Sequence, residues 1–194
     1  MALAISAGMP VRHCKKFPKV PTVWMMTDER VSADALMGAL TRLPRGAGVI
    51  FRHYSLPPAQ RRALFDAVRT IVKRRNLVLI LAGSARTARA WRADGWHGRS
   101  PGPSTMLHTA PAHNFREIRQ AELAGAHLLF LSPVFPTRSH PAARTLGPMR
   151  LAALLRQARR PVIALGGMTK ERWPPIKQTG ATGWAAIDAW SGPA

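Results

Sequence analysis

The sequence predicts one α/β domain, a compact (β/α)8 barrel of the TIM type with a short irregular N-terminal extension. Along the 194 residues, eight short apolar runs alternate with amphipathic stretches. Most of these runs lack polar alternation, which is typical of parallel strands buried on both faces. The length fits one domain with a substantial core. An open doubly wound sheet is the alternative architecture.

The predicted strands are apolar segments rich in Val, Ile, Leu and Trp. They are Thr22–Met26, Gly48–Phe51, Leu77–Ala82, Gly95–His97, Thr105–His108, His127–Leu131, Val162–Leu165 and Trp184–Ile187. Eight such strands, each followed by a connecting segment, favour a barrel closed on itself over an open sheet.

The predicted helices lie between the strands. They are Ala33–Leu43, Pro58–Arg75, Ala85–Ala93, Asn114–Ala124, Gly147–Arg159 and Thr169–Thr179. Asn114 with Glu117 three residues later is a helix-capping pattern, and Thr169 is the expected cap of the last helix. The segment Ser100–Ser104, between the fourth and fifth strands, has no clear helical pattern.

The chain is strongly basic, since 29 Lys and Arg against 9 Asp and Glu give a net charge of +20. Such a charge suggests nucleic acid as a partner. The basic residues are spread along the chain, however, and no basic stripe is interleaved with aromatic residues as in single-strand binders. We therefore expect no nucleic-acid partner. A positive field also attracts anionic substrates such as phosphate esters.

We expect residues 1–20 to form a flexible basic leader and residues 21–194 to form the single barrel domain. In the leader the basic residues follow the apolar run, which is the reverse of a secretory signal. No stretch approaches the roughly 20 apolar residues of a membrane span. The only cysteine, Cys14, excludes an intramolecular disulfide. We expect a cytoplasmic protein with no membrane partner.

Functional groups of a (β/α)8 barrel follow the strands at one end of the barrel. Gly166 and Gly167 follow the seventh strand, where a glycine turn before a helix lets backbone N–H groups approach an anion. The loop after the sixth strand holds the hydroxyls of Thr137 and Ser139, an arginine and His140, which suit an oxyanion. A plain tight turn and an ordinary surface loop are the alternatives.

Several histidines lie at or near predicted strand ends and could face the mouth of the barrel. They are His53, His97 and His108. Their spacing is not diagnostic of a metal site, and no metal ligand is predicted.

These motifs resemble the thiamine phosphate synthase/TenI superfamily. The resemblance is strong from about Thr109 to Trp190. It rests on the Ser132–His140 loop followed by Leu146-Gly147, the Pro161–Met168 strand and turn, Gly180–Gly183, Met26–Asp28, and His113 opening a helix that runs to Ala126.

The resemblance implies a (β/α)8 barrel acting in thiamine synthesis. Synthases of this family join a pyrimidine diphosphate, held by Mg²⁺, to a thiazole phosphate and release pyrophosphate. A related branch isomerises a thiazole phosphate carboxylate with a histidine as acid and base. The implied partners are therefore a thiazole phosphate and a pyrimidine diphosphate, and a homo-oligomer is compatible with the sequence.

Residues are carried over by position from the family motifs. His113 matches the histidine of the isomerising branch, and Arg52 matches the arginine of the second-strand motif, so both are candidate catalytic residues. The candidate phosphate-binding residues follow the sixth, seventh and eighth strands: Thr137, Ser139, His140, Gly166, Gly167, Ile187 and Asp188.

The metal-binding half of the family pattern is missing. Ala82 and Gly83 stand where the third strand of the family ends in Asn-Asp, and Gly98–Gly102 lacks the second metal aspartate. Mg²⁺ prefers carboxylate oxygens, so its site and the synthase reaction are in question. Asp188 replaces a phosphate-binding serine, and a carboxylate repels phosphate unless it is protonated or bridged by a cation. A tautomerase or a non-catalytic, regulatory phosphate-ligand barrel is the alternative.

Overall fold

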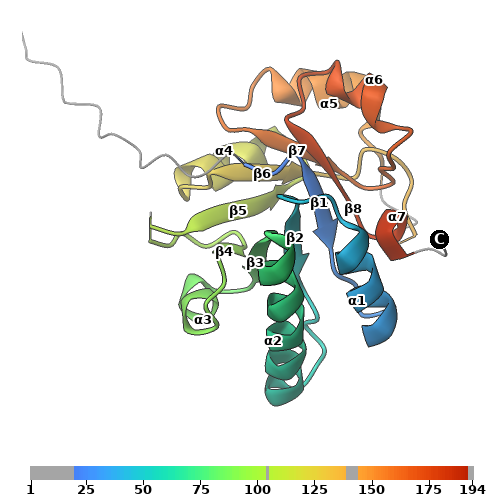
Figure 1. The fold of residues 1–194 in the computed structure, drawn as a ribbon. Coiled ribbons are helices and arrows are strands. Elements are labelled where there is room, and N and C mark those ends of the chain that lie inside the picture. The colour runs from blue at the N-terminus through green and yellow to red at the C-terminus, as the bar shows by residue number, and fades with distance from the viewer. Residues whose placement is uncertain (1–19, 104, 139–143, 192–194) are drawn as a thin grey trace, which may run out of the picture.

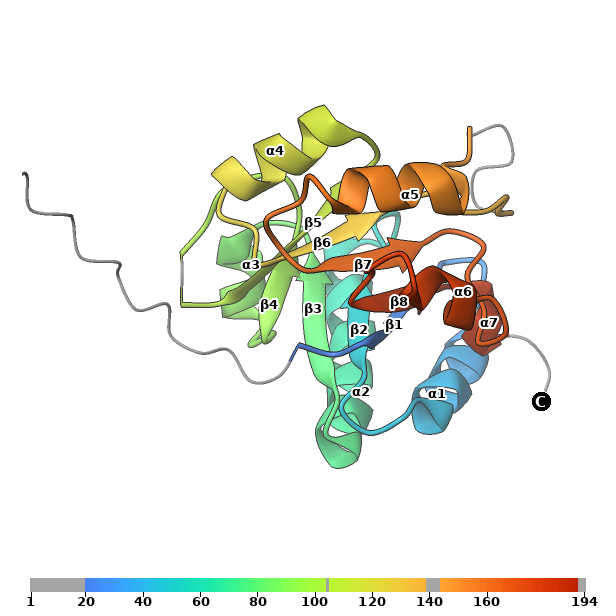
Figure 2. The ribbon, with the colours of Figure 1, turned by 90° about the horizontal axis from the view of Figure 1, so that it is seen from above.

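Eight parallel strands close into a barrel in sequence order, with the helices outside it (Figures 1 and 2). The computed structural model describes residues 20–103, 105–138 and 144–191. The elements are β1 (Val23–Met26), α1 (Ala33–Arg42), β2 (Gly48–Phe51), α2 (Pro58–Arg75), β3 (Val78–Ala82), α3 (Ala85–Ala90), β4 (Gly95–His97), β5 (Leu107–Ala112), α4 (Phe115–Leu123), β6 (Leu128–Leu131), α5 (Gly147–Leu155), β7 (Val162–Leu165), α6 (Trp173–Lys177), β8 (Gly183–Ala186) and α7 (Asp188–Ser191). The predicted fold class is confirmed. The predicted leader lies outside the described residues, apart from Val20.

The barrel interior is filled around the indole of Trp24, which is fully buried. Trp24 is opposite Gly48 in the register of β1 and β2, and the missing side chain of Gly48 makes room for the indole ring. The ring of Phe130 packs edge-on against it, with centroids 5.3 Å apart. The indole Nε1 donates a hydrogen bond to the Pro21 carbonyl at 2.6 Å, so its polar atom is satisfied.

Two further apolar layers lie between the strands and the helices. Figures 1 and 2 both place α1 and α2 on one side of the barrel and α4 and α5 on the other. Phe65 of α2 is in the first layer, and Ile118 of α4 and Leu151 of α5 are in the second. The last helix, α7, lies beside α1, where an Arg42 guanidinium N–H donates to the Trp190 carbonyl at 3.0 Å.

The fifth strand differs from the prediction of Thr105–His108. It runs from Leu107 to Ala112 because Thr109, Ala110 and Ala112 are buried and pair with β6, although Pro111 lies within it. Because proline usually indicates a strand end, the sequence did not predict this extension of the strand. His108 therefore lies near the start of β5. It stacks on Trp96, with centroids 4.4 Å apart, in the outer layer and does not face the mouth of the barrel.

The sixth helix is shorter than the predicted Thr169–Thr179. It begins at Trp173, and two prolines occupy its first turn, where a missing N–H is tolerated. The Thr169 hydroxyl accepts a hydrogen bond from the Arg172 N–H at 3.4 Å in a turn before the helix. The short α7 was not predicted. Within the described residues, the β4–β5 connection contains no helix, and no helix has the length and apolarity to span a membrane.

Substitution of Gly48 by alanine should destabilise the barrel. A Cβ atom there would lie 2.1 Å from the Trp24 ring, so buried groups must move. We expect a loss of about 1–3 kcal/mol in the free energy of unfolding, measured by urea denaturation. Gly38→Ala in α1 is the matched control, because its Cβ meets only the flexible end of Arg42 at 3.3 Å. Equal effects of the two substitutions would contradict this packing.

Candidate functional site

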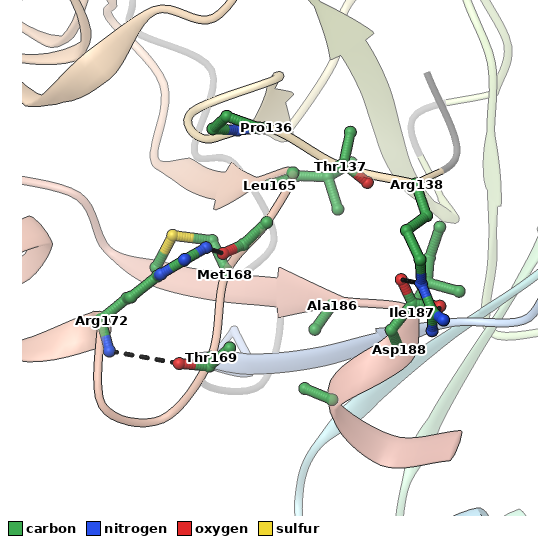
Figure 3. Close-up of a pocket in the computed structure, with 13 residues that line it drawn as sticks. Pro136, Thr137, Arg138, Leu165, Met168, Thr169, Arg172, Ala186, Ile187 and Asp188 are labelled. Atoms are coloured by element: carbon green, nitrogen blue, oxygen red, sulfur yellow. Dashed lines mark hydrogen bonds and ion pairs between the residues drawn. The ribbon is translucent and has the colours of Figure 1, made fainter. Parts of the chain in front are cut away.

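A pocket of about 180 Å³ lies at the carboxyl ends of β7 and β8, beside the loop that follows β6 (Figure 3). Its lining includes Thr137, Gly166, Gly167, Ile187 and Asp188, which the sequence assigned to phosphate binding. The structure thus brings these residues together. The remaining lining residues are Pro136, Arg138, Leu165, Met168, Thr169, Arg172, Ala186 and Ala189. The predicted binding residues Ser139 and His140 lie outside the described residues.

Two glycines allow the β6 loop to pack directly on the turn after β7. Gly166 and Gly167 have φ angles of +93° and +60°, and a Cβ on Gly167 would lie 2.5 Å from the Pro136 carbonyl oxygen. The N–H groups of Val134 and Phe135 donate to the carbonyls of Leu165 and Gly166 at 2.9 and 3.0 Å. Only glycine has both the backbone freedom and the small size for this contact. The loop therefore holds the carbonyl groups of Leu165 and Gly166 in place.

Arg172 is a pocket residue that the sequence did not single out. Its guanidinium donates to the Gly167 carbonyl at 2.5 Å and lies 5.0 Å from the centre of the Phe135 ring. The sequence did not indicate these contacts, because the helix predicted from Thr169 would place Arg172 on its surface. A cation five residues after a glycine turn is the signal that could have indicated it.

Asp188 is paired with arginines from two other loops. Arg138 lies next to it (Figure 3), with a nitrogen–oxygen distance of 3.3 Å, and Arg30 approaches the same carboxylate at 3.7 Å. The side chain of Arg138 is 78% exposed, so this pair contributes little to stability. The pairing instead brings two cations to the carboxylate that had been expected to repel a phosphate.

Arg52 lies at the carboxyl end of β2 and is held by β1. Its guanidinium donates to the Thr27 carbonyl at 2.7 Å and to an Asp28 oxygen at 2.9 Å. Asp28 also accepts a hydrogen bond from Arg30 at 2.7 Å. This hydrogen bond, together with the charges of Arg30 and Arg52, outweighs burial and lowers the pKa of Asp28 to about 2. Asp28 is therefore an ionised partner of two arginines.

Two buried histidines face hydroxyl groups near the mouth. The Nδ1 atom of His97 lies 2.9 Å from the Thr109 hydroxyl oxygen, and that of His53 lies 2.9 Å from the Thr27 hydroxyl oxygen. Burial lowers the pKa of His97 to about 3 and also lowers that of His53. Both rings are neutral at physiological pH.

His113 directly follows β5 and does not line the pocket. Its Nδ1 atom lies 2.8 Å from a Glu117 carboxylate oxygen, which Arg99 also approaches at 3.2 Å. Burial would raise the pKa of Glu117, but the hydrogen bond from His113 and the charge of Arg99 lower it below the ordinary value. The His113 side chain is 44% exposed.

A sequence model described as thiamine monophosphate synthase matches residues 23–190. The chain belongs to this family. The "Putative thiamine-phosphate synthase 2" of Aquifex aeolicus is 29% identical over 180 residues, covering 87% of this chain and 97% of the relative. The thiamine-phosphate synthase of Bacillus velezensis is 26% identical over 186 residues, covering 87% of this chain and 82% of the relative.

Solved structures support the fold of this thiamine monophosphate synthase family member. The thiamine phosphate pyrophosphorylase of Pyrococcus furiosus superposes with a TM-score of 0.76 at 24% identity, covering 90% of this chain and 89% of that one. At this identity the likeness concerns the barrel itself and not its chemistry.

The residues of this family member do not fit the Mg²⁺ that the family resemblance implies. At the end of β3, Arg61 donates to the carbonyls of Ala82 and Arg52, each at 2.7 Å. A guanidinium therefore lies where a metal site would need carboxylates. In the described part of the chain, no three His, Cys, Asp or Glu side chains are grouped so that they could hold a metal ion.

The buried neutral His97 should make folding sensitive to acid. Its pKa is about 3 in the folded state, against an ordinary value of 6.5, so below pH 6.5 only the unfolded chain binds the proton. Stability should fall as the pH drops from 6.5 toward 3, by up to about 1.4 kcal/mol per pH unit. His97→Gln should show a shallower decline in chemical denaturation. An NMR titration midpoint of the His97 ring near 6.5 would contradict this.

Proposed function

We propose that this chain is a thiamine-synthesis barrel that binds a thiazole phosphate, with the phosphate in the pocket at the ends of β7 and β8. The observation that carries this proposal is the composition of the pocket. It combines the Gly166–Gly167 turn, the Thr137 hydroxyl and two guanidinium groups, Arg138 and Arg172. Hydroxyls, backbone N–H groups and arginines are the groups that bind phosphate oxygens in proteins.

The backbone of the turn supports this placement. Its carbonyls accept hydrogen bonds from Val134, Phe135 and Arg172. The N–H groups of Gly167 and Met168 have no backbone acceptor among the described residues. A bound phosphate would supply that acceptor, as in other anion sites built from successive backbone N–H groups.

The charges around the pocket also suit a phosphate ester. Arg30, Arg138 and Arg172 carry three positive charges against the single carboxylate of Asp188. A phosphomonoester carries about −1.5 to −2 charges at neutral pH. In this proposal the phosphate competes with Asp188 for Arg138, so Asp188 weakens phosphate binding without preventing it.

The diphosphate half of the family reaction is proposed not to operate in this chain. The ends of β2 and β3 present the guanidinium groups of Arg52 and Arg61, and Asp28 is paired with two arginines. These guanidinium groups and the paired carboxylate do not orient a metal-bound diphosphate leaving group. We therefore place the chemistry of this chain, if it is catalytic, on the thiazole side of the reaction.

Isomerisation of a thiazole phosphate is the second candidate function, and His113 supports it. The Nδ1–H of a neutral His113 ring can donate to Glu117 at 2.8 Å, which leaves the lone pair of Nε2 as a base. A carboxylate partner of this kind orients the histidine ring and fixes which ring nitrogen carries the proton. His113 follows β5 at the same barrel end as the pocket.

Binding of the thiazole phosphate should respond in opposite directions to two substitutions. Arg172→Ala should weaken affinity about tenfold or more, because a charge-assisted hydrogen bond is lost. Asp188→Ser should tighten it by a similar factor, because Arg138 is released. Isothermal titration calorimetry measures both, with the exposed Arg45→Ala as a charge-matched control. Unchanged affinity in both variants would refute the pocket.

Activity assays separate the candidate reactions. The folded protein with pyrimidine diphosphate, thiazole phosphate and Mg²⁺ should give no thiamine phosphate above background. With the thiazole phosphate carboxylate, isomerisation should occur and His113→Gln should abolish it while leaving thiazole phosphate affinity unchanged. Mg²⁺-dependent thiamine phosphate formation would contradict the loss of the diphosphate half. Binding without either reaction would favour the regulatory alternative.

A further inference from the structure

A second pocket lies at the opposite end of the barrel from the candidate functional site. It has a volume of about 200 Å³ and is formed by the C-terminal part of α2, the start of β3 and the segment that joins α3 to β4. Its lining residues are Arg69, Val72, Lys73, Asn76, Leu77, Leu79, Arg92 and Asp94. Its volume is close to that of the candidate phosphate pocket.

Three cations line this pocket. Arg69 and Lys73 are four residues apart on α2 and therefore project from the same helix face. Arg92 comes from the segment before β4. Arg69 has a salt bridge with Asp66, at 3.5 Å. Among the described residues, no carboxylate forms an ion pair with Lys73 or Arg92, so the pocket has an excess of positive charge.

The single carboxylate of the pocket already has a structural partner. An Asp94 oxygen accepts a hydrogen bond from the Leu79 N–H at 2.7 Å, and the Asp94 backbone N–H donates to the Leu79 carbonyl at 2.8 Å. Asp94 thus connects β3 to the start of β4. It does not neutralise all three cations.

Helix stability explains only part of this cluster. Cations in the last turn of α2 favourably face the carbonyls of its C-terminus, which accounts for Lys73. Arg92 directly follows the C-cap of α3, where the N–H groups of Arg92 and Ala93 close the helix end. This end requires the φ angle of +58° at Arg92, a conformation that favours glycine or asparagine over arginine. Asn76, with φ of +54°, shows the residue type expected for such a position. A guanidinium is therefore placed here against the backbone preference.

We propose that this cluster, defined as Arg69, Lys73, Asn76 and Arg92, binds a small phosphorylated anion. The cations and the Asn76 carboxamide supply donors, and the apolar side chains of Val72, Leu77 and Leu79 enclose one side. A small, half-open pocket without aromatic residues suits a small phosphate or diphosphate better than the extended backbone of a nucleic acid, which needs a continuous basic groove.

Titration of the full ¹⁵N-labelled chain with inorganic phosphate and with pyrophosphate tests this site. At constant ionic strength, the backbone amide signals of Asn76, Arg92 and Asp94 should shift and saturate. Arg92→Gly should weaken binding about tenfold, because one charge-assisted hydrogen bond is lost. The fold should persist, because glycine suits the positive φ angle.

Two control variants separate this site from the rest of the surface. Arg89→Ala removes an exposed charge of α3 outside the pocket and should leave the affinity within about twofold, as expected for a surface charge away from specific contacts. Arg172→Ala should leave the amide shifts of Asn76 and Arg92 unchanged, because Arg172 belongs to the pocket at the other end.

Three results would overturn the proposal. Amide shifts that sodium chloride reproduces at equal ionic strength would mean that only the ionic atmosphere is observed. Equal affinity of Arg92→Gly and the wild type for phosphate would show that the cluster does not bind the anion. Shifts with a DNA duplex but with neither phosphate nor pyrophosphate would assign this surface to a nucleic-acid backbone instead.

Discussion

The close packing of the β6 loop on the Gly166–Gly167 turn is the constraint on which the rest of the pocket depends. Because a side chain on either glycine would collide with the loop, the loop and the turn lie against each other and share backbone hydrogen bonds. This contact places Thr137 beside the end of β8 and puts the Gly167 carbonyl within reach of Arg172. The positions of Thr137 and of the Arg172 contact thus follow from a steric condition on two residues.

Arginine side chains surround the carboxylates at the mouth of this barrel. Asp28 and Asp188 are each shared between two arginines, and Arg61 crosses the end of β3 to reach two backbone carbonyls. The guanidinium of Arg61 also lies 5.4 Å from the Tyr54 ring centre and 5.5 Å from that of Trp91. Desolvation lowers its pKa. These contacts fix positive charge at the strand ends, which suits anionic substrates and opposes a divalent metal.

The sequence was sufficient for the barrel, because strands buried on both faces leave continuous apolar runs at regular intervals. The family motifs likewise indicated Thr137 and the Gly166–Gly167 turn, which line the same pocket, because these motifs are short contiguous segments. The extension of β5 past Pro111 was missed because burial and pairing with β6 outweighed a local proline signal. Arg61 and Arg172 were missed for other reasons. Arg61 reaches the Ala82 carbonyl, 21 residues further along the chain, and that contact exists only in three dimensions. Arg172 bonds a carbonyl five residues before it, but the predicted helix from Thr169 concealed that contact.

The closure of the barrel by β8 has a consequence for biosynthesis. β1 pairs with β2 on one edge and with β8 on the other, and Val23 is opposite Trp184 in that second pairing. While the chain leaves the ribosome, one edge of β1 therefore stays unpaired until β8 has been translated. An unpaired strand edge is prone to aggregation during this interval. Because Ile187 and Asp188 directly follow β8, the pocket at the ends of β7 and β8 is also among the last parts of the barrel to be assembled.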